Sequence, residues 1–119
     1  MADLRLTAEQ ADCVRRILRT HLPGGASVRV FGSRATGRGL KPHSDLDLLI
    51  DSPEELPLAV MADLREALAE SNLPFSVDLL ERRDASDEFV ARLAALGMVE
   101  MRLLPALGVR DFEDTDTPS

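Results

Sequence analysis

The chain contains no tryptophan and no tyrosine, and it has only four phenylalanines among its 119 residues. Proteins that bind single-stranded nucleic acid usually stack bases on such side chains, so this deficit argues against that class. Acidic residues outnumber basic ones by 21 to 14, for a formal charge of −7. Affinity for a nucleic-acid backbone comes from many lysine and arginine contacts. Nucleic acid is therefore not an expected partner, whereas a mononucleotide is compatible with this charge.

A single cysteine, Cys13, excludes an intrachain disulfide and favours a reducing compartment. No apolar run approaches the roughly 20 residues needed to cross a bilayer, and the first residues lack the features of a signal peptide. We therefore expect a soluble, cytoplasmic protein without membrane association. The length suits one compact domain that buries roughly two thirds of its unfolded surface.

Hydrophobic periodicity predicts helices that alternate with short strands. Thr7 and Gln10 are spaced as a capping box, and Ser86 can cap the last helix. The predicted helices cover residues 7–21, 57–71 and 86–97, the last with Phe89, Val90, Leu93 and Leu96 facing the core. The predicted strands cover residues 28–31, 45–51 and 75–80, with a brief helical turn after residue 34 and an extended piece over 99–104.

This order of elements predicts a single α/β domain, residues 1–107, built on a small mixed sheet flanked by helices. Aspartate and glutamate dominate after Gly108, so residues 108–119 cannot bury enough apolar surface to order themselves. We expect an acidic, disordered tail there.

Asp45 and Asp47 lie two residues apart on a predicted strand. That spacing points both carboxylates to one face, roughly 6.5 to 7 Å apart at the backbone. Carboxylates are ligands that Mg²⁺ prefers, and two or three of them suffice beside substrate phosphates. Asp78 is the third candidate, because a charge in the apolar strand around it would be costly without a partner or a metal. Asp78 is also a candidate general base.

Gly32 and Ser33 precede these carboxylates and predict a turn that can hold terminal phosphates. Arg34, Arg38 and Lys41 follow in an otherwise acidic chain, where the charge of a polyphosphate would need neutralising. Taken singly, the glycine-serine pair reads as an ordinary turn, Asp78 as a surface strand residue and the basic side chains as solvated loop charges. The hypothesis rests on the occurrence of all these parts in one order.

Three segments together resemble the minimal nucleotidyltransferases of the DNA polymerase β superfamily: Phe31 to Gly37, Ser44 to Leu48, and Val77 to Leu80. The resemblance covers roughly residues 7 to 104. In that family the glycine-serine pair contacts nucleotide phosphates and three carboxylates bind magnesium. The resemblance implies the same roles for the site residues Gly32, Ser33, Asp45, Asp47 and Asp78, with ATP or another NTP as substrate and two Mg²⁺ ions, or Mn²⁺, as cofactor.

Residues 70–80 and 86–89 are similar to a bacterial subgroup that is encoded beside a helical HEPN-type protein. Some of those pairs are toxin–antitoxin systems in which the nucleotidyltransferase adds AMP to a tyrosine of the toxin; in others the helical protein is called a substrate-binding subunit. The resemblance implies transfer of AMP to a hydroxyl of such a partner. Because this chain has no tyrosine, a tyrosine acceptor would lie on another protein. A homodimer and a hetero-oligomer both stay open.

Two other functions are compatible with the sequence. A non-catalytic nucleotide-binding module could neutralise or regulate a helical partner by occlusion, its acidic surface covering a basic site. A small-molecule nucleotidyltransferase is disfavoured, because no second substrate domain is present.

Overall fold

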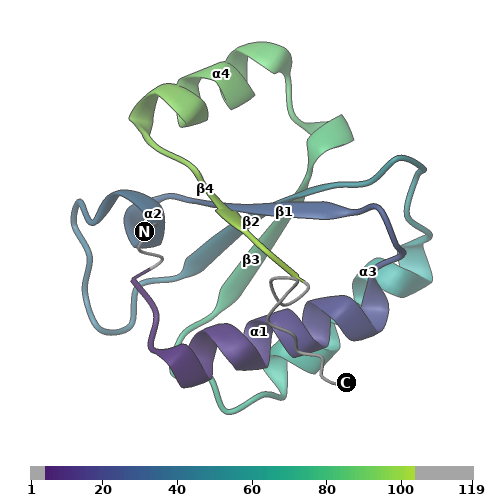
Figure 1. Cartoon of the computed structure of the whole chain (residues 1–119), viewed down its shortest axis with the longest axis horizontal. Coiled ribbons are helices and arrows are strands. Elements are labelled where there is room, and N and C mark those ends of the chain that lie inside the picture. Colours follow the sequence, from purple (N-terminus) through teal and green to yellow (C-terminus); the bar gives the residue numbers. More distant parts are fainter. Residues whose placement is uncertain (1–4, 104–119) are drawn as a thin grey trace, which may run out of the picture.

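The computed structural model describes residues 5–103 as a sheet with helices on its two sides (Figure 1). Helices α1 and α3 cover one face of the sheet, while α4 lies beyond the other face. In chain order the elements are α1 (Ala8–His21), β1 (Ser27–Phe31), α2 (Ser33–Thr36), β2 (Leu46–Asp51), α3 (Leu58–Ala69), β3 (Val77–Glu81), the 3-10 turn η1 (Arg82–Asp84), α4 (Asp87–Leu96) and β4 (Val99–Met101).

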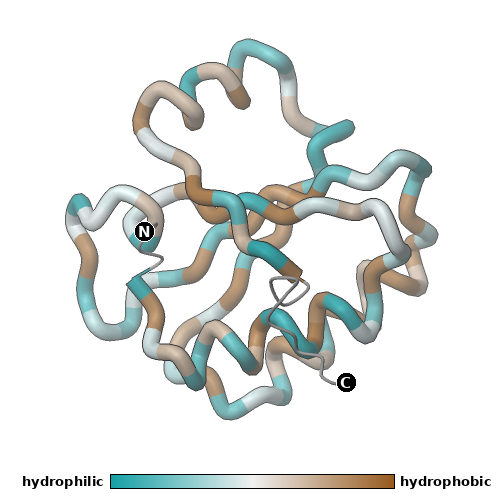
Figure 2. Tube along the Cα trace, in the orientation of Figure 1, coloured by the Kyte–Doolittle hydropathy of each residue, from teal (hydrophilic) through white to brown (hydrophobic). Residues whose placement is uncertain are grey.

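Local signals in the sequence explain how the longer helices begin. The capping box at the start of α1 is formed, with the Thr7 hydroxyl accepting from the Gln10 N–H and the Gln10 side chain accepting from the Thr7 N–H. Ser86 caps α4 by accepting from the Phe89 N–H. Hydrophobic and hydrophilic residues alternate around α1 (Figure 2), which therefore presents an apolar stripe to the sheet.

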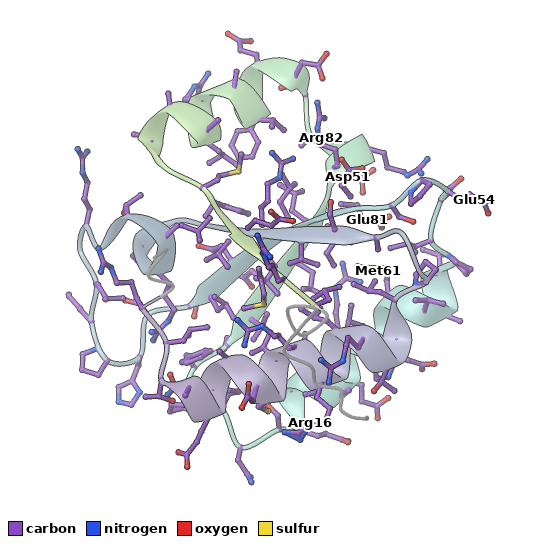
Figure 3. The ribbon with its side chains drawn as sticks, in the orientation of Figure 1. Arg16, Asp51, Glu54, Met61, Glu81 and Arg82 are labelled. Atoms are coloured by element: carbon purple, nitrogen blue, oxygen red, sulfur yellow. The ribbon has the colours of Figure 1, made fainter. Side chains whose placement is uncertain are left out.

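The strands form one mixed sheet in the order β3–β2–β1–β4. β1 is antiparallel to both β2 and β4, and β2 is parallel to β3. The crossover from β2 to β3 runs through α3, as a parallel connection requires. Asp51 and Glu81 lie at the carboxyl ends of β2 and β3 (Figure 3). The amino ends of these two strands therefore lie at the same edge of the sheet as the carboxyl end of the antiparallel β1. The α/β class and the mixed sheet are thus confirmed.

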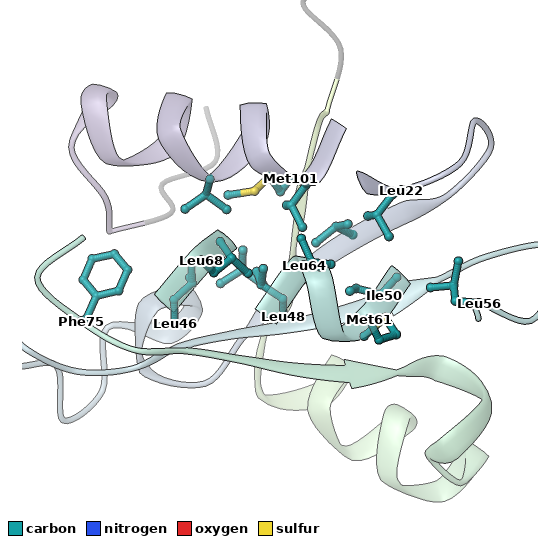
Figure 4. Packing of buried hydrophobic residues seen from close by; sticks show 14 residues of the cluster. Leu22, Leu46, Leu48, Ile50, Leu56, Met61, Leu64, Leu68, Phe75 and Met101 are labelled. Atoms are coloured by element: carbon teal, nitrogen blue, oxygen red, sulfur yellow. The ribbon is translucent and has the colours of Figure 1, made fainter. Parts of the chain in front are cut away.

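The hydrophobic core lies between the sheet and the pair α1 and α3 (Figure 4). Leu46, Leu48 and Ile50 alternate along β2 and point to this side. They belong to one cluster with buried residues of the two helices, which are Val14, Leu18, Met61, Leu64 and Leu68. Full burial of each larger apolar side chain contributes roughly 1.5 to 3 kcal/mol. This burial holds β2 in a fixed position and register.

The prediction for α4 was right about its bounds and wrong about its packing. No residue of α4 is buried, and Phe89 and Leu96 are 37% and 57% exposed. Val90 and Leu93 are only half-buried. Apolar spacing predicts an amphipathic helix but does not reveal whether the same chain supplies a surface to cover it. The apolar stripe of α4 is therefore largely open.

The bounds of β1, β2 and β3 differ from the predictions by one or two residues, which leaves Asp45 just before β2 rather than on it. The extended piece predicted over 99–104 is a shorter strand, β4, that ends at Met101. The predicted tail, residues 108–119, lies outside the described residues. Within residues 5–103, no helix combines the length and the apolar character needed to traverse a bilayer.

Candidate active site

The predicted site residues gather where β1 ends and where β2 and β3 begin. Phe31, the last residue of β1, lies opposite Asp47 in the antiparallel register. Asp47 in turn lies opposite Asp78 in the parallel register. Cα partners in a sheet point their side chains to the same face. The sheet therefore brings the two carboxylates side by side on the face away from α1 and α3, and the Gly32 turn begins next to them.

Gly32 makes the closest approach to the carboxylates. Its φ is +76°, a left-handed conformation, and a Cβ at this position would lie 2.3 Å from Oδ2 of Asp47. Only glycine fits such a position without a shift of the backbone or of Asp47. The glycine of the predicted phosphate-binding turn and the second aspartate of the predicted metal pair therefore form one packed unit.

Ser33 opens α2, a short helix of four residues. The turn is held by the Gly32 carbonyl, which accepts from the N–H groups of Ala35 and Thr36. Among the described residues, neither the hydroxyl nor the N–H of Ser33 makes a hydrogen bond. Both groups are therefore available to an anionic ligand beside Asp47.

Asp47 has the strongest electrostatic perturbation at the site. Its pKa is raised from 3.8 to about 6, mainly by burial. The charges of Asp78 and Asp45 and a side-chain hydrogen bond with Asp78 make smaller contributions to this rise. Each contribution disfavours the charged form of a carboxyl group. Three acidic side chains thus share one small region in which a cation would be stabilised.

The acidic residues fit a divalent cation by their chemistry and position. Hard cations such as Mg²⁺ take oxygen ligands, and the mutual repulsion of Asp45, Asp47 and Asp78 is relieved by positive charge. In their present orientations, however, no three acidic, histidine or cysteine side chains of residues 5–103 form a ready metal-binding set. The carboxylates must turn toward a common point for an ion to bind.

Two of the premises from the sequence need correction here. Asp78 is exposed rather than buried in its strand, so the cost of a buried charge does not explain it. Asp78 is a candidate site residue because it lies opposite Asp47 in the parallel register of β2 and β3. Asp45 is also exposed and precedes β2, so the regular alternation of a strand does not fix its direction. Both side chains have room to move, whereas Asp47 is half-buried.

Arg34 occupies a different place from the one its predicted role requires. Its side chain is only 5% exposed, and its guanidinium donates to the backbone carbonyls of Ser44, Pro42 and Arg5 at 2.9, 3.1 and 2.8 Å. It also stacks on the Phe75 ring, 4.1 Å from the centroid, and burial lowers its pKa. The sequence predicts a nucleotide contact for Arg34, but the structure shows its guanidinium engaged with the protein.

Arg38 and Lys41 remain exposed on the loop between α2 and β2. The backbone of this loop is fixed by two side chains: the Arg38 N–H donates to the Thr36 hydroxyl at 3.1 Å, and the Lys41 N–H donates to the Ser44 hydroxyl at 2.8 Å. Neither basic side chain hydrogen-bonds to another described residue. Both are free to reach a ligand held at the turn.

A cavity of about 710 Å³ opens beside Asp45 and was not predicted from the sequence. Its walls come from the end of α3, the connection to β3 and the loop before β2. The lining residues are His43, Asp45, Arg65, Leu68, Ala69, Leu73, Pro74, Phe75, Ser76 and Val77. Nothing in the spacing of these residues marks them as neighbours, because α3 and the folding of two loops bring them together.

Comparison with known proteins agrees with this arrangement. The model of the nucleotidyltransferase domain family matches residues 12–97, a range that includes Gly32, Ser33 and all three aspartates. The chain belongs to this family. This nucleotidyltransferase is 41% identical over 88 residues to a protein from Haemophilus influenzae, "Probable protein adenylyltransferase MntA". That match covers 74% of this chain and 75% of the relative.

Solved structures show the same fold. The nucleotidyltransferase resembles a chain from a toxin–antitoxin crystal structure with AMP-PNP, with a TM-score of 0.62 and 24% identity. It also resembles a chain from a variant of the toxin–antitoxin pair MntA–HpeT, with a TM-score of 0.61 and 22% identity. Each match covers 77% of this chain and 72% of the other. At these identities the likeness establishes the fold.

Proposed function

We propose that this nucleotidyltransferase moves AMP from ATP to a hydroxyl group on a partner protein, with Mg²⁺ as its cofactor. The observation that carries the proposal is the packing of Gly32 against Asp47, which has Asp78 as its strand neighbour. A phosphate-sized turn and a cation-binding group are thereby in contact. The 41% identity to a protein named as an adenylyltransferase supports AMP as the group transferred.

In this proposal each residue has a distinct task. Ser33 receives the terminal phosphates with its free hydroxyl and N–H, and Gly32 lets the Asp47 carboxylate pack directly against the turn. Arg38 and Lys41 neutralise phosphate charge from the loop. Arg34, which the sequence groups with them, instead holds the loop in place through the carbonyls of Pro42 and Ser44 and ties it to the carbonyl of Arg5.

Asp45, Asp47 and Asp78 would hold the metal, up to two ions, and the metal would neutralise charge on the phosphates. The acceptor oxygen forms a bond to the α-phosphorus while the bond from that phosphorus to the bridging oxygen breaks, and pyrophosphate leaves. Asp78, which is exposed on β3, accepts the proton of the acceptor hydroxyl. Positioning and electrostatics account for the catalysis, as expected for transfer at phosphorus.

The acceptor belongs to another protein in this proposal. The chain contains no tyrosine, so a tyrosine acceptor would lie on another protein. Two structural neighbours come from toxin–antitoxin complexes, which supports a protein partner. The helical HEPN-type protein suggested by the resemblance is the partner to test first.

Incubation of the protein with α-labelled ATP, Mg²⁺ and the helical product of a neighbouring gene should transfer label to that product and release pyrophosphate. The Asp45→Asn/Asp47→Asn double variant should lose this transfer, because it lacks two of the three carboxylates. Equal labelling by the double variant would refute the catalytic proposal. If the double variant labels nothing but still neutralises the partner fully, occlusion by a nucleotide-binding module is the better account.

A further inference from the structure

Within residues 5–103, β3 is an edge strand, with one side paired to no other strand. Among the described strands it pairs only with β2. The Leu46 N–H donates to the Ser76 carbonyl, and in a parallel pair successive residues direct their backbone groups to alternate sides. The N–H and C=O groups of Val77, Leu79 and Glu81 therefore point away from β2. An extended polypeptide is the natural complement of such a row.

The cavity beside Asp45 lies at the start of this edge. Ser76 and Val77 line it and lead directly into β3. Its walls are held in place before any ligand arrives, since Phe75 is stacked under the Arg34 guanidinium and His43 Nδ1 donates to the Pro74 carbonyl at 3.1 Å. Figure 4 shows the Phe75 ring at the entrance to β3. A volume of about 710 Å³ is ample for an apolar side chain and part of its backbone.

We propose, as an extension of the proposed function, that a basic, extended segment of the acceptor protein pairs with the free edge of β3 and places an apolar side chain in the cavity beside Asp45. Val77 lines the cavity, and Asp78, the next residue, points to the opposite face. Side chains of an added strand alternate in the same way. The residue that bears the hydroxyl would therefore be adjacent in sequence to the apolar residue.

Charge selects the occupant of this edge. Three acidic side chains are placed at this edge: Asp45 in the cavity wall, and Asp78 and Glu81 on β3. Arg65 is the cation of the cavity wall with a permanent charge, whereas beyond the end of β3 Arg82 pairs with Asp87 and Arg83 is exposed. A second copy of the chain carries a net charge of −7, and its own last residues are also acidic, so both would be repelled. A segment with lysine or arginine between its apolar residues would be attracted.

The probe for this proposal is a short fluorescent peptide in which valine alternates with lysine around one central tyrosine. Its binding is followed by fluorescence anisotropy, which does not depend on catalysis, and AMP transfer to the tyrosine is measured separately. A peptide with glutamate in place of lysine should bind at least about tenfold more weakly, a difference of about 1.4 kcal/mol. Absence of AMP transfer with intact peptide binding would count against the proposed function alone.

Two matched pairs of variants locate the peptide. Ala69→Trp fills the cavity from the exposed end of α3, whereas Ala62→Trp adds the same bulk at an exposed position of α3 outside the cavity. Glu81→Pro removes an outward N–H at a residue whose φ of −83° is close to that of proline, and Glu81→Ala removes only the side chain. Ala69→Trp and Glu81→Pro should each raise the peptide Kd about tenfold or more relative to their controls.

Several results would overturn the proposal. The lysine peptide could fail to bind, or the lysine and glutamate peptides could bind equally well. Ala69→Trp could bind like Ala62→Trp, or Glu81→Pro like Glu81→Ala. Circular dichroism of all four variants, with unchanged thermal transitions, shows that a loss of binding does not reflect unfolding.

Discussion

At the scale of single residues, the contact between Gly32 and Asp47 fixes the geometry of the candidate site. The turn residue has a left-handed φ, and the carboxylate oxygen fills the space where any other residue would have its Cβ. The same packing half-buries Asp47 and places it where Asp78 and Asp45 raise its pKa. The glycine therefore determines both the shape of the turn and the position of the charge next to it.

Replacement of Gly32 by alanine tests this dependence. The Gly32→Ala variant should lose most of its transferase activity and about 1 to 3 kcal/mol of its free energy of unfolding, because a positive φ and a clash act together. Gly39→Ala is the matched control, since Gly39 also has a positive φ, +66°, but a Cβ there meets no atom within 4 Å. Urea unfolding and AMP transfer measure the two effects. Equal losses in both variants would show that the contact with Asp47 is unimportant.

The proximity of Gly32, Asp47 and Asp78 agrees with the sequence-based prediction, because residue type and order carry much of this information. A glycine before a serine, and two aspartates at a spacing of two, describe a turn and a strand that the chain forms locally. Arg34 could not be placed in this way. Beside Arg38 and Lys41 it has the appearance of a third loop charge, and its burial depends on Phe75, which is distant in sequence and close only in the folded molecule.

At the scale of elements, Arg34 joins three segments that carry the motif. It follows Ser33 in α2, donates to the carbonyl of Ser44 next to Asp45, and stacks on Phe75 just before β3. Sequence periodicity gave the bounds of most helices and strands to within two residues but no such link between them. It also predicted the bounds of α4 correctly, but it wrongly predicted that the apolar side chains of α4 face the core. Whether another surface covers a helix is not a local property of its sequence.

Loss of the Arg34 side chain should therefore loosen the whole site. Arg34→Met should lower the free energy of unfolding by roughly 2 to 4 kcal/mol, since three part-buried carbonyls lose a charged donor and a buried side chain loses its partners. Arg34→Lys should recover little of this, because one ammonium cannot span three carbonyls and stack on a ring. Denaturant unfolding gives the comparison, with exposed Arg38→Met as the control expected to lie within about 0.5 kcal/mol of wild type. A lysine variant as stable as wild type would contradict the proposed linkage.

At the scale of the whole molecule, the excess of negative charge is concentrated further by the three aspartates of the candidate site. The chain has a net charge of −7, and three of its aspartates lie in one region of the sheet. Folding brings these carboxylates together and half-buries one of them, which costs free energy when they are ionised. The core between the sheet and the pair α1 and α3 must outweigh this cost. Stability and cation binding are thus linked through Asp47.

This linkage has a definite sign in the metal-free protein. The pKa of Asp47 is 3.8 in its ordinary state and about 6 in the folded chain, so between these values the native state binds more protons than the unfolded state. Its contribution to stability therefore falls as the pH rises from about 4 to about 6 and is then constant. After allowance for solvent screening, the fall is on the order of 1 to 2 kcal/mol.

Urea unfolding of wild type and of Asp47→Asn across this pH range isolates the effect from that of the other acidic groups. The free energy of unfolding of wild type relative to Asp47→Asn should decline with pH, and Asp51→Asn, at the exposed end of the same strand, should follow wild type. Millimolar Mg²⁺ should restore the wild-type value near neutral pH and leave Asp47→Asn unchanged, because the ion binds the ionised carboxylate in the native state. If the free energy of unfolding of wild type relative to Asp47→Asn rises with pH, Asp47 is stabilised in its charged form without metal. The cation site would then have to be sought elsewhere.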